Sequence, residues 1–549
     1  MTICAPCTPT RTPSKHVYYG MTKSLCGTCK RAVDAKIHLE DDGVYFAKFC
    51  PDHGHERVMV SSDVEWYLDA LAFVSPNTPP RGEVKKVSAG CPFDCGPCAS
   101  HQQKVYMPVV PITSACNLDC PICYTVNKNE GAHVLSKESF AKILGHLREQ
   151  HDELDIINFT GGEPTLHPEQ LRMARAAGIR RLTVSTNGLK LLDEEYVKEL
   201  AAADARIVLS LDTFRDEVDK ILLGATTVKA KLKVLDHLEK HDVTTTILPA
   251  VAAGLNDADV PALFDLLVSR RTVCSLEMHT LTFTGQGGVG FDRQARITIP
   301  DLHRILETHT GGRIRPKDFV PSPLAHAHCY SICYLLMLDG GGYVPFTRFL
   351  GRERVYDLLS DSIYIQPREK VETMLREAID ELWADPDSCP EGEAVLRTLR
   401  GLIDRMFPPG APISLEERQR IAERASKAVY IHSHMDEETF DVARIMKCSV
   451  GVPEEDGSNI PTCSYNVLYR EKDARFADAS MLARMKDTRP EGVPAAKNRS
   501  LPIVRLRCSS SPSSTRRSSA RQTWRRARCS TRFRAGSARR ASAPSTASA

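Results

Sequence analysis

Short apolar runs alternate with amphipathic segments between residues 105 and 281. The apolar runs, each long enough for a buried strand, are 105–113, 154–160, 179–186, 205–212, 244–251 and 273–281. The segments between them have apolar residues at helical spacing and are 136–150, 167–178, 193–203, 226–241 and 259–270. This alternation predicts βα units around a parallel sheet. We therefore expect an α/β fold with a partial (βα)6 TIM-like barrel, whose chemistry lies at the carboxyl ends of the strands.

The pattern differs on either side of this core. Residues 1–104 are rich in cysteine and predict a small metal-stabilised module, with a strand at 44–50 and a short helix at 63–73. Residues 282–499 have a helix-rich middle and scattered cysteines, which predicts an α-rich C-terminal region. We expect that region to contribute to the substrate site or to a further metal cluster.

Residues 500–549 have almost no hydrophobic periodicity and carry twelve Arg, without Lys or acidic residues. Two explanations are open: a disordered basic tail that binds anionic polymers, or the frameshifted end of a GC-rich reading frame. The abundance of Arg, Ser, Ala and Pro favours the frameshift. Without this tail, 60 basic residues face 69 acidic ones, a net charge of −9. The charge of the chain therefore gives no reason to expect nucleic acid binding.

The composition also predicts the cellular compartment of the protein. The chain has no apolar run near the roughly 20 residues that a membrane span requires, and its first residues lack the apolar core of a secretory signal. Its nineteen cysteines lie mostly before residue 124, at spacings typical of metal ligands. Metal binding in a reducing compartment explains them better than disulfides do. We therefore expect a cytoplasmic protein that can still contact a membrane surface.

Three cysteines follow the first predicted barrel strand. Cys116, Cys120 and Cys123 have the spacing C-x3-C-x2-C. Such a trio can bind three irons of a 4Fe-4S cluster and leave the fourth iron without a protein ligand, whereas ordinary electron carriers close all four positions. An open iron can bind and reduce a small molecule. A zinc knuckle or isolated thiols are the alternatives.

Polar and glycine-rich motifs follow the next three strands. Gly161, Gly162, Glu163 and Pro164 lie in FTGGEP, Ser185 and Asn187 in STNG, and Ser210 and Asp212 in SLD. Glycines let backbone groups approach a ligand closely, and the polar side chains suit hydroxyl or carboxylate groups. Each motif alone is weak, since GGEP also suits a simple turn. Their order after successive strands predicts one cofactor site at the rim, with Tyr124 beside it.

The cysteine trio and these rim motifs together resemble the radical SAM (S-adenosylmethionine) superfamily. The resemblance implies a 4Fe-4S cluster that binds SAM, and reductive cleavage of SAM to a 5′-deoxyadenosyl radical. That radical abstracts hydrogen from an unactivated carbon. By the same resemblance Tyr124 lies near the adenine, and a one-electron donor such as ferredoxin or flavodoxin is required.

Other cysteines predict further metal sites. Cys91, Cys95 and Cys98 repeat the C-x3-C-x2-C spacing before the first barrel strand, which favours an auxiliary 4Fe-4S cluster, with His101 as one candidate for its fourth ligand. The set Cys26, Cys29, Cys50 and His53 suits a single iron or zinc ion. Cys329, Cys448 and Cys463 either close another cluster or are buried structural residues. We expect Cys274 and Cys389 to be structural.

The order of these motifs resembles the tetraether and membrane-spanning lipid synthase group, some members of which carry an older label as pterin methyltransferases. The resemblance covers most of residues 20–475 and implies carbon–carbon coupling of two inert lipid chain ends. Other radical SAM reactions remain as alternatives: methylation of a pterin or lipid, or peptide maturation. A non-enzymatic iron–sulfur carrier or scaffold is a further alternative. An apolar tunnel at the barrel mouth would favour lipid, and a polar cleft would favour pterin or peptide.

Overall fold

The computed structural model describes residues 15–81, 86–96, 98–125, 129–151 and 153–476. The Arg-rich tail of residues 500–549 lies outside the described residues. Within the described part of the chain, none of the helices combines the length and the apolar character that crossing a membrane requires.

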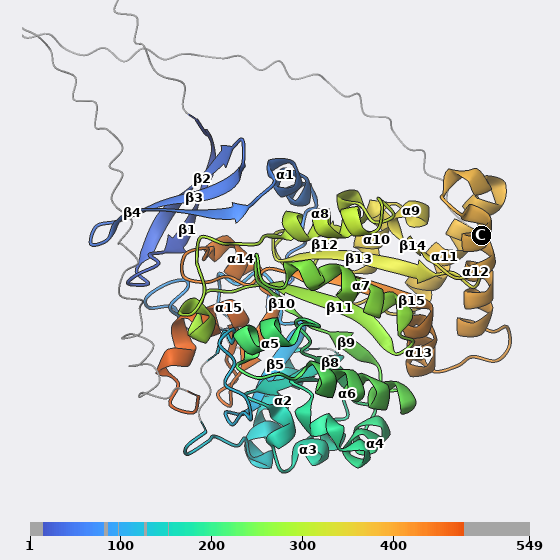
Figure 1. Ribbon diagram of the computed structural model, residues 1–549, viewed down its shortest axis with the longest axis horizontal. Helices are drawn as coiled ribbons and strands as arrows, with labels where there is room; N and C mark the ends of the chain where they lie inside the picture. The colour runs from blue at the N-terminus through green and yellow to red at the C-terminus, as the bar shows by residue number, and fades with distance from the viewer. Residues whose placement is uncertain (1–14, 82–85, 97, 126–128, 152, 477–549) are drawn as a thin grey trace, which may run out of the picture. The chain divides into compact units, whose positions relative to one another are not determined.

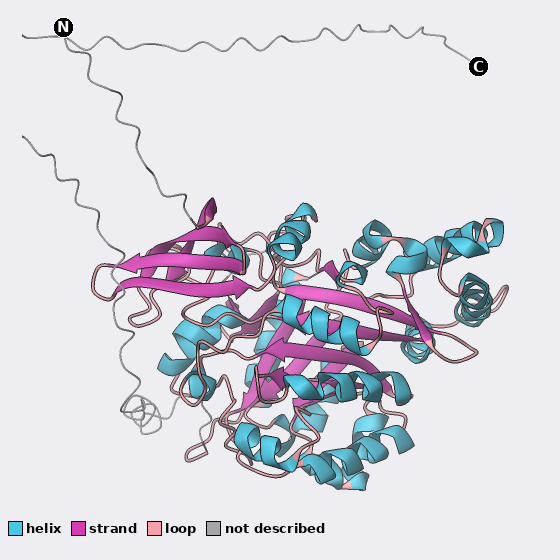
Figure 2. Cartoon of the chain, turned by 45° about the horizontal axis from the view of Figure 1, so that its top comes forward, coloured by secondary structure: helices cyan, strands magenta, loops and turns pink. Residues whose placement is uncertain are grey.

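The N-terminal module is a four-stranded antiparallel meander (Figure 2). Its strands are β1 (Val17–Leu25), β2 (Ala32–Glu40), β3 (Gly43–Cys50) and β4 (Gly54–Ser61). Buried and exposed residues alternate along β2, so Ala35 and Ile37 face Val44 and Phe46 of β3 in a small core. Helix α1 (Val64–Ala72) follows, and its first turn is capped by the Asp63 side chain, which accepts from Trp66 N–H at 2.8 Å. The strand and helix predicted here are confirmed.

The central element is a parallel sheet with helices on its outer face (Figure 1). Its six strands in chain order are β5 (Met107–Thr113), β6 (Ile156–Gly161), β7 (Arg181–Thr186), β8 (Arg206–Leu209), β9 (Thr245–Ile247) and β11 (Val273–Thr280). The helices between them are α2 (Lys137–Gln150), α3 (Gln170–Ala177), α4 (Glu194–Ala202), α5 (Asp216–Leu223), α6 (Val228–Lys240) and α7 (Val260–Ser269). Apart from α5, these are the elements that the hydrophobic pattern predicts. The predicted barrel is therefore confirmed.

The sheet continues beyond the predicted core at both of its edges. Strand β15 (Ser426–His432) pairs parallel with β11, and β13 (Tyr330–Met337) pairs antiparallel with β15. At the other edge, β16 (Val450–Pro453) pairs parallel with β5 and antiparallel with β17 (Asn459–Pro461). The C-terminal region thus covers sheet edges that would otherwise expose unpaired backbone groups.

The rest of the C-terminal region is helical, as predicted. Its main helices are α8 (Ile299–His309), α10 (Arg352–Leu358), α11 (Glu369–Ala384), α12 (Gly392–Met406) and α13 (Leu415–Ala425). Its short elements are β12 (Val320–Pro321), β14 (Tyr343–Pro345), α9 (Thr347–Leu350), α14 (Val442–Met446) and α15 (Thr462–Ser464), whereas the short strand β10 (Ala250–Val251) belongs to the barrel and pairs with β11. Apolar residues of α11 and α12 pack with those of β13 in a second core, separate from the barrel core.

Candidate functional site

The cysteine trio lies in the loop that leaves β5 at its carboxyl end. The loop is held locally: Cys116 N–H donates to Asn129 Oδ1 at 2.8 Å, and Cys123 N–H donates to the Cys120 carbonyl at 3.0 Å. All three thiols are partly buried. Burial raises the pKa of the Cys116 thiol to about 12, and it raises the pKa of Cys120 above its usual range. A metal binds the thiolate form, so binding a cluster here would release these protons, and three cysteine sulfurs are a donor set that suits iron.

The glycine pair after β6 lets two backbones meet. A Cβ on Gly161 would lie 2.1 Å from the Thr113 carbonyl oxygen, and one on Gly162 would lie 2.2 Å from that of Ala115. Gly162 N–H donates to the Thr113 carbonyl at 2.8 Å. Pro164 then starts a short turn. The sequence predicts that the backbone at these glycines approaches a ligand closely. At these atoms the close neighbour is instead the backbone at the start of the cysteine loop.

Glu163 ties three segments of the rim together. Its buried carboxylate accepts from Thr165 Oγ1 at 2.6 Å, Thr186 Oγ1 at 2.7 Å and Asn187 N–H at 2.7 Å. Burial raises the pKa of this carboxyl. Asn187 in turn donates from Nδ2 to Asn117 Oδ1 at 2.7 Å, which links the end of β7 to the cysteine loop. Two predicted site residues, Glu163 and Asn187, thus fix the position of the loop.

The remaining rim residues lie at neighbouring strand ends. The Asp212 side chain is buried and accepts from Ala250 N–H at 2.8 Å and from Ser210 Oγ at 3.3 Å. Burial raises the pKa of Asp212. Ser185 donates to Asn158 Oδ1 at 3.0 Å, and both residues line the interior of the barrel. The structure therefore gathers the predicted motifs at one end of the sheet.

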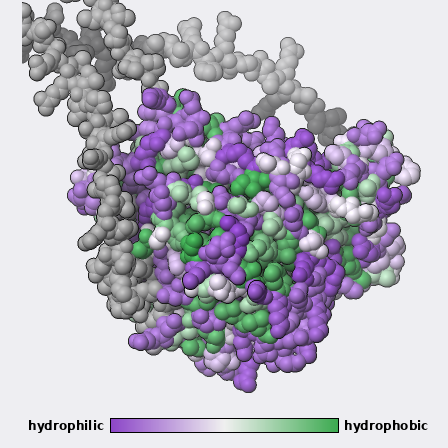
Figure 3. Space-filling view, viewed as in Figure 1, coloured by the Kyte–Doolittle hydropathy of each residue, from purple (hydrophilic) through white to green (hydrophobic). Residues whose placement is uncertain are grey.

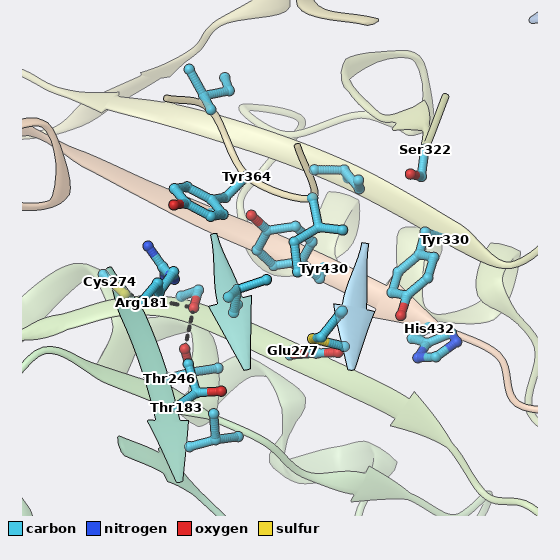
Figure 4. Close-up of a pocket in the computed structure, with 18 of the residues that line it drawn as sticks. Arg181, Thr183, Thr246, Cys274, Glu277, Ser322, Tyr330, Tyr364, Tyr430 and His432 are labelled. Atoms are coloured by element: carbon cyan, nitrogen blue, oxygen red, sulfur yellow. Dashed lines mark hydrogen bonds between the residues drawn. The ribbon is translucent and has the colours of Figure 1, made fainter. Parts of the chain in front are cut away.

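A cavity of about 280 Å³ extends from this rim through the barrel (Figure 4). Its rim end includes Tyr124, Ser185, Glu277, His279, His432 and His434. The lining away from the rim is mixed: apolar side chains such as Val371, Leu375, Leu402 and Met406 occur together with the charged side chains of Arg181, Glu423 and Lys427. Hydroxyl and amide side chains from the barrel strands, among them Asn158, Thr183 and Thr246, line the middle.

An ion cluster lies at the opposite end of the strands from the cysteine loop. Arg181 at the start of β7 pairs with Glu423 of α13, with Nη1 and Oε1 2.7 Å apart, and Arg206 Nε lies 3.3 Å from the same oxygen. Gln419 Nε2 donates to Glu423 at 3.1 Å, and the Arg181 guanidinium lies over the Tyr364 ring (Figure 4). Burial alone would raise the pKa of Glu423, but the two guanidinium groups hold it below its usual range. No local sequence pattern predicts this cluster, because its members come from distant segments.

The four predicted ligands of the N-terminal module come together. The metal-binding atoms of Cys26, Cys29, Cys50 and His53 all lie within 4.8 Å of one another. Hydrogen bonding to His53, whose Nδ1 lies 3.5 Å from Cys50 Sγ, lowers the pKa of Cys50 to about 6. Three thiols and one imidazole at this spacing suit a single tetrahedral ion.

The predicted auxiliary cysteines form two groups. Cys91, Cys95 and Cys98 lie close together: a hydrogen bond to Cys95, burial and the charge of Cys98 all raise the pKa of Cys91. His101, the candidate fourth ligand, places Nε2 3.0 Å from the Cys448 carbonyl oxygen. That contact uses one ring nitrogen and leaves Nδ1 as the atom available to a metal.

In the second group, burial raises the pKa of Cys448, and nearby Cys463 and Cys329 raise it further, so these three thiols are neighbours. Arg444 Nε donates to Cys329 Sγ at 3.4 Å. Cys274 and Cys389, expected to be structural, are both buried.

A cluster of three histidines was not predicted. His279, His432 and His434 place ring nitrogens within 4.8 Å of one another at the rim end of the cavity. The sequence did carry a signal, since HSH at 432–434 has two histidines one residue apart and His279 ends a predicted strand.

Comparison with known proteins agrees with this arrangement. The radical SAM superfamily model matches residues 110–267, and the HMPTM N-terminal zinc ribbon domain model matches residues 18–62. The chain is 28% identical to the 7,8-dihydro-6-hydroxymethylpterin dimethyltransferase of Methanocaldococcus jannaschii over 82% of this chain and 94% of that protein. It is 38% identical to the tungsten-containing aldehyde ferredoxin oxidoreductase cofactor-modifying protein of Pyrococcus furiosus over 38% of this chain and 61% of that protein.

Among solved structures, the FeFe-hydrogenase maturase HydG from Carboxydothermus hydrogenoformans aligns with a TM-score of 0.33 and 14% identity, over 59% of this chain and 82% of that one. The two family matches coincide with the four-stranded module and with the barrel. The chain therefore contains a radical SAM domain, preceded by an N-terminal segment that matches a zinc ribbon domain.

Proposed function

We propose that this enzyme abstracts hydrogen from an unactivated carbon of a lipid alkyl chain and couples chain ends by forming a carbon–carbon bond. The observation that carries the proposal is the set of apolar side chains from α11 and α12 that line part of the barrel cavity, which is reached from the rim where the cysteine loop lies. When bound, the 4Fe-4S cluster and SAM supply a 5′-deoxyadenosyl radical. A terminal methyl group has no acidic proton, so acid–base catalysis cannot activate it.

In this proposal the rim residues bind and orient the cofactors. Cys116, Cys120 and Cys123 hold the cluster, and Glu163 and Asn187 keep the loop in place through the bonds described above. Tyr124, adjacent to the third cysteine, lines the cavity and is positioned to contact both SAM and the substrate. The enclosing barrel excludes water, which protects a reactive intermediate.

The shape and lining of the cavity favour an alkyl chain over a heterocycle. Leu375 on α11 and Leu402 and Met406 on α12 extend the lining well beyond the barrel strands. A pterin is flat and hydrogen-bonding, and it gains little from an apolar extension of this kind. An alkyl chain gains about 0.8 kcal/mol for each buried CH2 group.

Exposed apolar surface fits a substrate that comes from a membrane. In Figure 3 hydrophobic side chains gather in patches near the middle of the face shown, and hydrophilic side chains dominate its edge. Apolar patches rimmed by polar residues are typical of interaction surfaces. We propose peripheral contact with a membrane, and a ferredoxin or flavodoxin as the electron donor.

The auxiliary cysteines have a place in the same proposal. Joining two inert carbons requires the first to be held while the second is activated, and a cluster bound at these cysteines would supply the group that holds it. We assign Cys91, Cys95 and Cys98 to one auxiliary cluster, and Cys329, Cys448 and Cys463 to another. Replacing Cys95 with Ala should leave SAM cleavage intact and abolish coupled product. Coupled product at the normal rate would show that the first auxiliary cluster has another role.

Methylation of a pterin is the second candidate. It is favoured by the 28% identity to a pterin dimethyltransferase over nearly its whole length, and by the polar residues in the middle of the cavity, such as Asn158 and Thr183.

One experiment separates the two candidates. The anaerobically reconstituted enzyme is incubated with SAM and reductant, and with either a long-chain lipid or a dihydropterin. Mass spectrometry then measures 5′-deoxyadenosine and the products. We expect the lipid to stimulate 5′-deoxyadenosine formation and to yield a coupled product. Stimulation by the pterin together with a methylated pterin would replace the lipid proposal with the second candidate.

A further inference from the structure

The histidine cluster is built from two segments that the fold brings together. His279 and His432 are register partners at the carboxyl ends of the parallel strands β11 and β15. His434 follows β15 by two residues, and its ring lies 4.0 Å from that of His432 and 4.9 Å from that of His279, between centroids. The position matters because the carboxyl ends of parallel strands carry the functional sites of barrel enzymes.

The surroundings of the cluster resemble those of metal ligands. Glu277 Oε1 lies 3.0 Å from His279 Nε2, so a proton on Nε2 is shared with a carboxylate and Nδ1 remains as a lone-pair donor. A carboxylate that orients a histidine in this way is common behind metal ions. Tyr330 stacks on His432 at 3.9 Å between ring centroids and restricts its rotation (Figure 4).

One positive group near the cluster opposes a cation: Arg444, whose charge acts on both His432 and His434. Its guanidinium, however, donates to Cys329 Sγ and to the Ser433 carbonyl, so its donors are directed at those acceptors.

We propose that His279, His432 and His434 bind one divalent metal ion of the zinc class at the rim end of the cavity. Three protein ligands leave a tetrahedral ion one open position, as in catalytic rather than structural zinc sites. All three residues line the cavity, so the open position faces the space that a ligand would occupy. The site shares no residue with the zinc ribbon, and it adjoins the second cysteine group, since His434 Nδ1 lies 3.6 Å from Cys463 Sγ. It does not depend on the substrate being a lipid.

The test counts metal ions on the reconstituted full-length enzyme. Zinc and iron per chain are measured by mass spectrometry after incubation with a small excess of Zn²⁺ and desalting. The variants are His279→Gln, which is farther from the cysteine groups than His434, and the control His303→Gln, a buried histidine of α8 outside the cluster. We expect His279→Gln to contain one zinc fewer than wild type and His303→Gln to match wild type, with iron equal in all three. Equal zinc in all three proteins would overturn the proposal.

A second measurement does not require a change in the cluster. In the Cys26→Ser/Cys50→Ser variant the ribbon loses two of its four ligands, and the zinc that remains is examined by X-ray absorption. The proposal predicts a first shell of nitrogen and oxygen alone. Sulfur scattering, or the absence of bound zinc, would contradict a three-histidine site.

Discussion

The two ends of the barrel are both polar and buried, but they are built differently. At the rim, thiols and carboxylates come from loops after the strands. Every hydrogen bond described above for Glu163 and Asp212 comes from an uncharged donor. At the opposite end, Glu423 is held by two guanidinium groups. The first arrangement leaves ligands for cofactors, and the second satisfies its own charges.

This difference predicts which substitutions should affect catalysis and which should affect folding. In barrel enzymes the loops after the strands carry function, and the other end carries stability. A hydrogen-bond network of neutral donors can rearrange at a moderate cost in folding stability. An unpaired buried charge costs much more, because the free energy of removing it from water is no longer offset by a partner.

The strongest test of the comparison is the removal of one rim thiol. Cys120→Ala deletes a proposed cluster ligand, and we expect it to abolish 5′-deoxyadenosine formation. The matched control is Cys274→Ala, at the start of β11 and beside the other end of the cavity, which should retain it. The product is measured by liquid chromatography after anaerobic incubation with SAM and reductant. Activity in Cys120→Ala, or its loss in the control, would break the distinction between the two ends.

The next largest effect is on folding, at the opposite end. Glu423→Ala leaves Arg181 and Arg206 without their carboxylate, and we expect the free energy of unfolding to fall by about 3–5 kcal/mol. The control Glu416→Ala removes a half-exposed partner of Arg180 and should cost less than about 1 kcal/mol. Anaerobic urea denaturation measures both. A small effect in Glu423→Ala would mean that the ion cluster does not stabilise the barrel.

Glu163→Gln tests the rim network without removing a ligand. The amide places an NH2 group where a carboxylate oxygen accepted hydrogen bonds, so a donor then faces a donor. We expect a loss of about 1–3 kcal/mol in stability and a raised KM for SAM, because the cysteine loop is no longer held in place. Glu169→Gln, at a partly exposed ion pair with Lys137, is the control. An unchanged KM for SAM would remove the positioning role of Glu163.

The smallest predicted effect concerns the far end of the cavity. Met406→Trp fills part of the apolar lining, and we expect the KM for a long-chain substrate to rise about tenfold, equivalent to ~1.4 kcal/mol of lost contact. Formation of 5′-deoxyadenosine without substrate should not change. Arg397→Trp places the same side chain on an exposed position of α12 and serves as the control. Equal KM values in the two variants would mean that the alkyl chain of the substrate does not reach the part of the cavity lined by Met406.

The sequence predicted the parts of the molecule that depend on local patterns. The six barrel strands and five of their helices follow from runs such as 273–281, and the cysteine and glycine motifs follow from their spacing. Strands β13 and β15 were not predicted as part of the sheet, because α11 and α12 separate them in the chain and nothing local marks them as neighbours of β11. The Arg181–Glu423 pair was missed for the same reason. The histidine cluster had a local signal in His432 and His434, but nothing local places His279 beside them.

The transfer of deuterium from a lipid methyl group to 5′-deoxyadenosine tests the proposed hydrogen abstraction directly. A lipid whose terminal methyl groups carry deuterium is incubated with the enzyme, SAM and reductant, and the 5′-deoxyadenosine is analysed by mass spectrometry. We expect deuterium in 5′-deoxyadenosine, because in the proposed reaction the radical forms at the rim and the cavity holds the lipid chain end next to this radical. Formation of 5′-deoxyadenosine without deuterium, with the lipid unchanged, would contradict the proposed reaction.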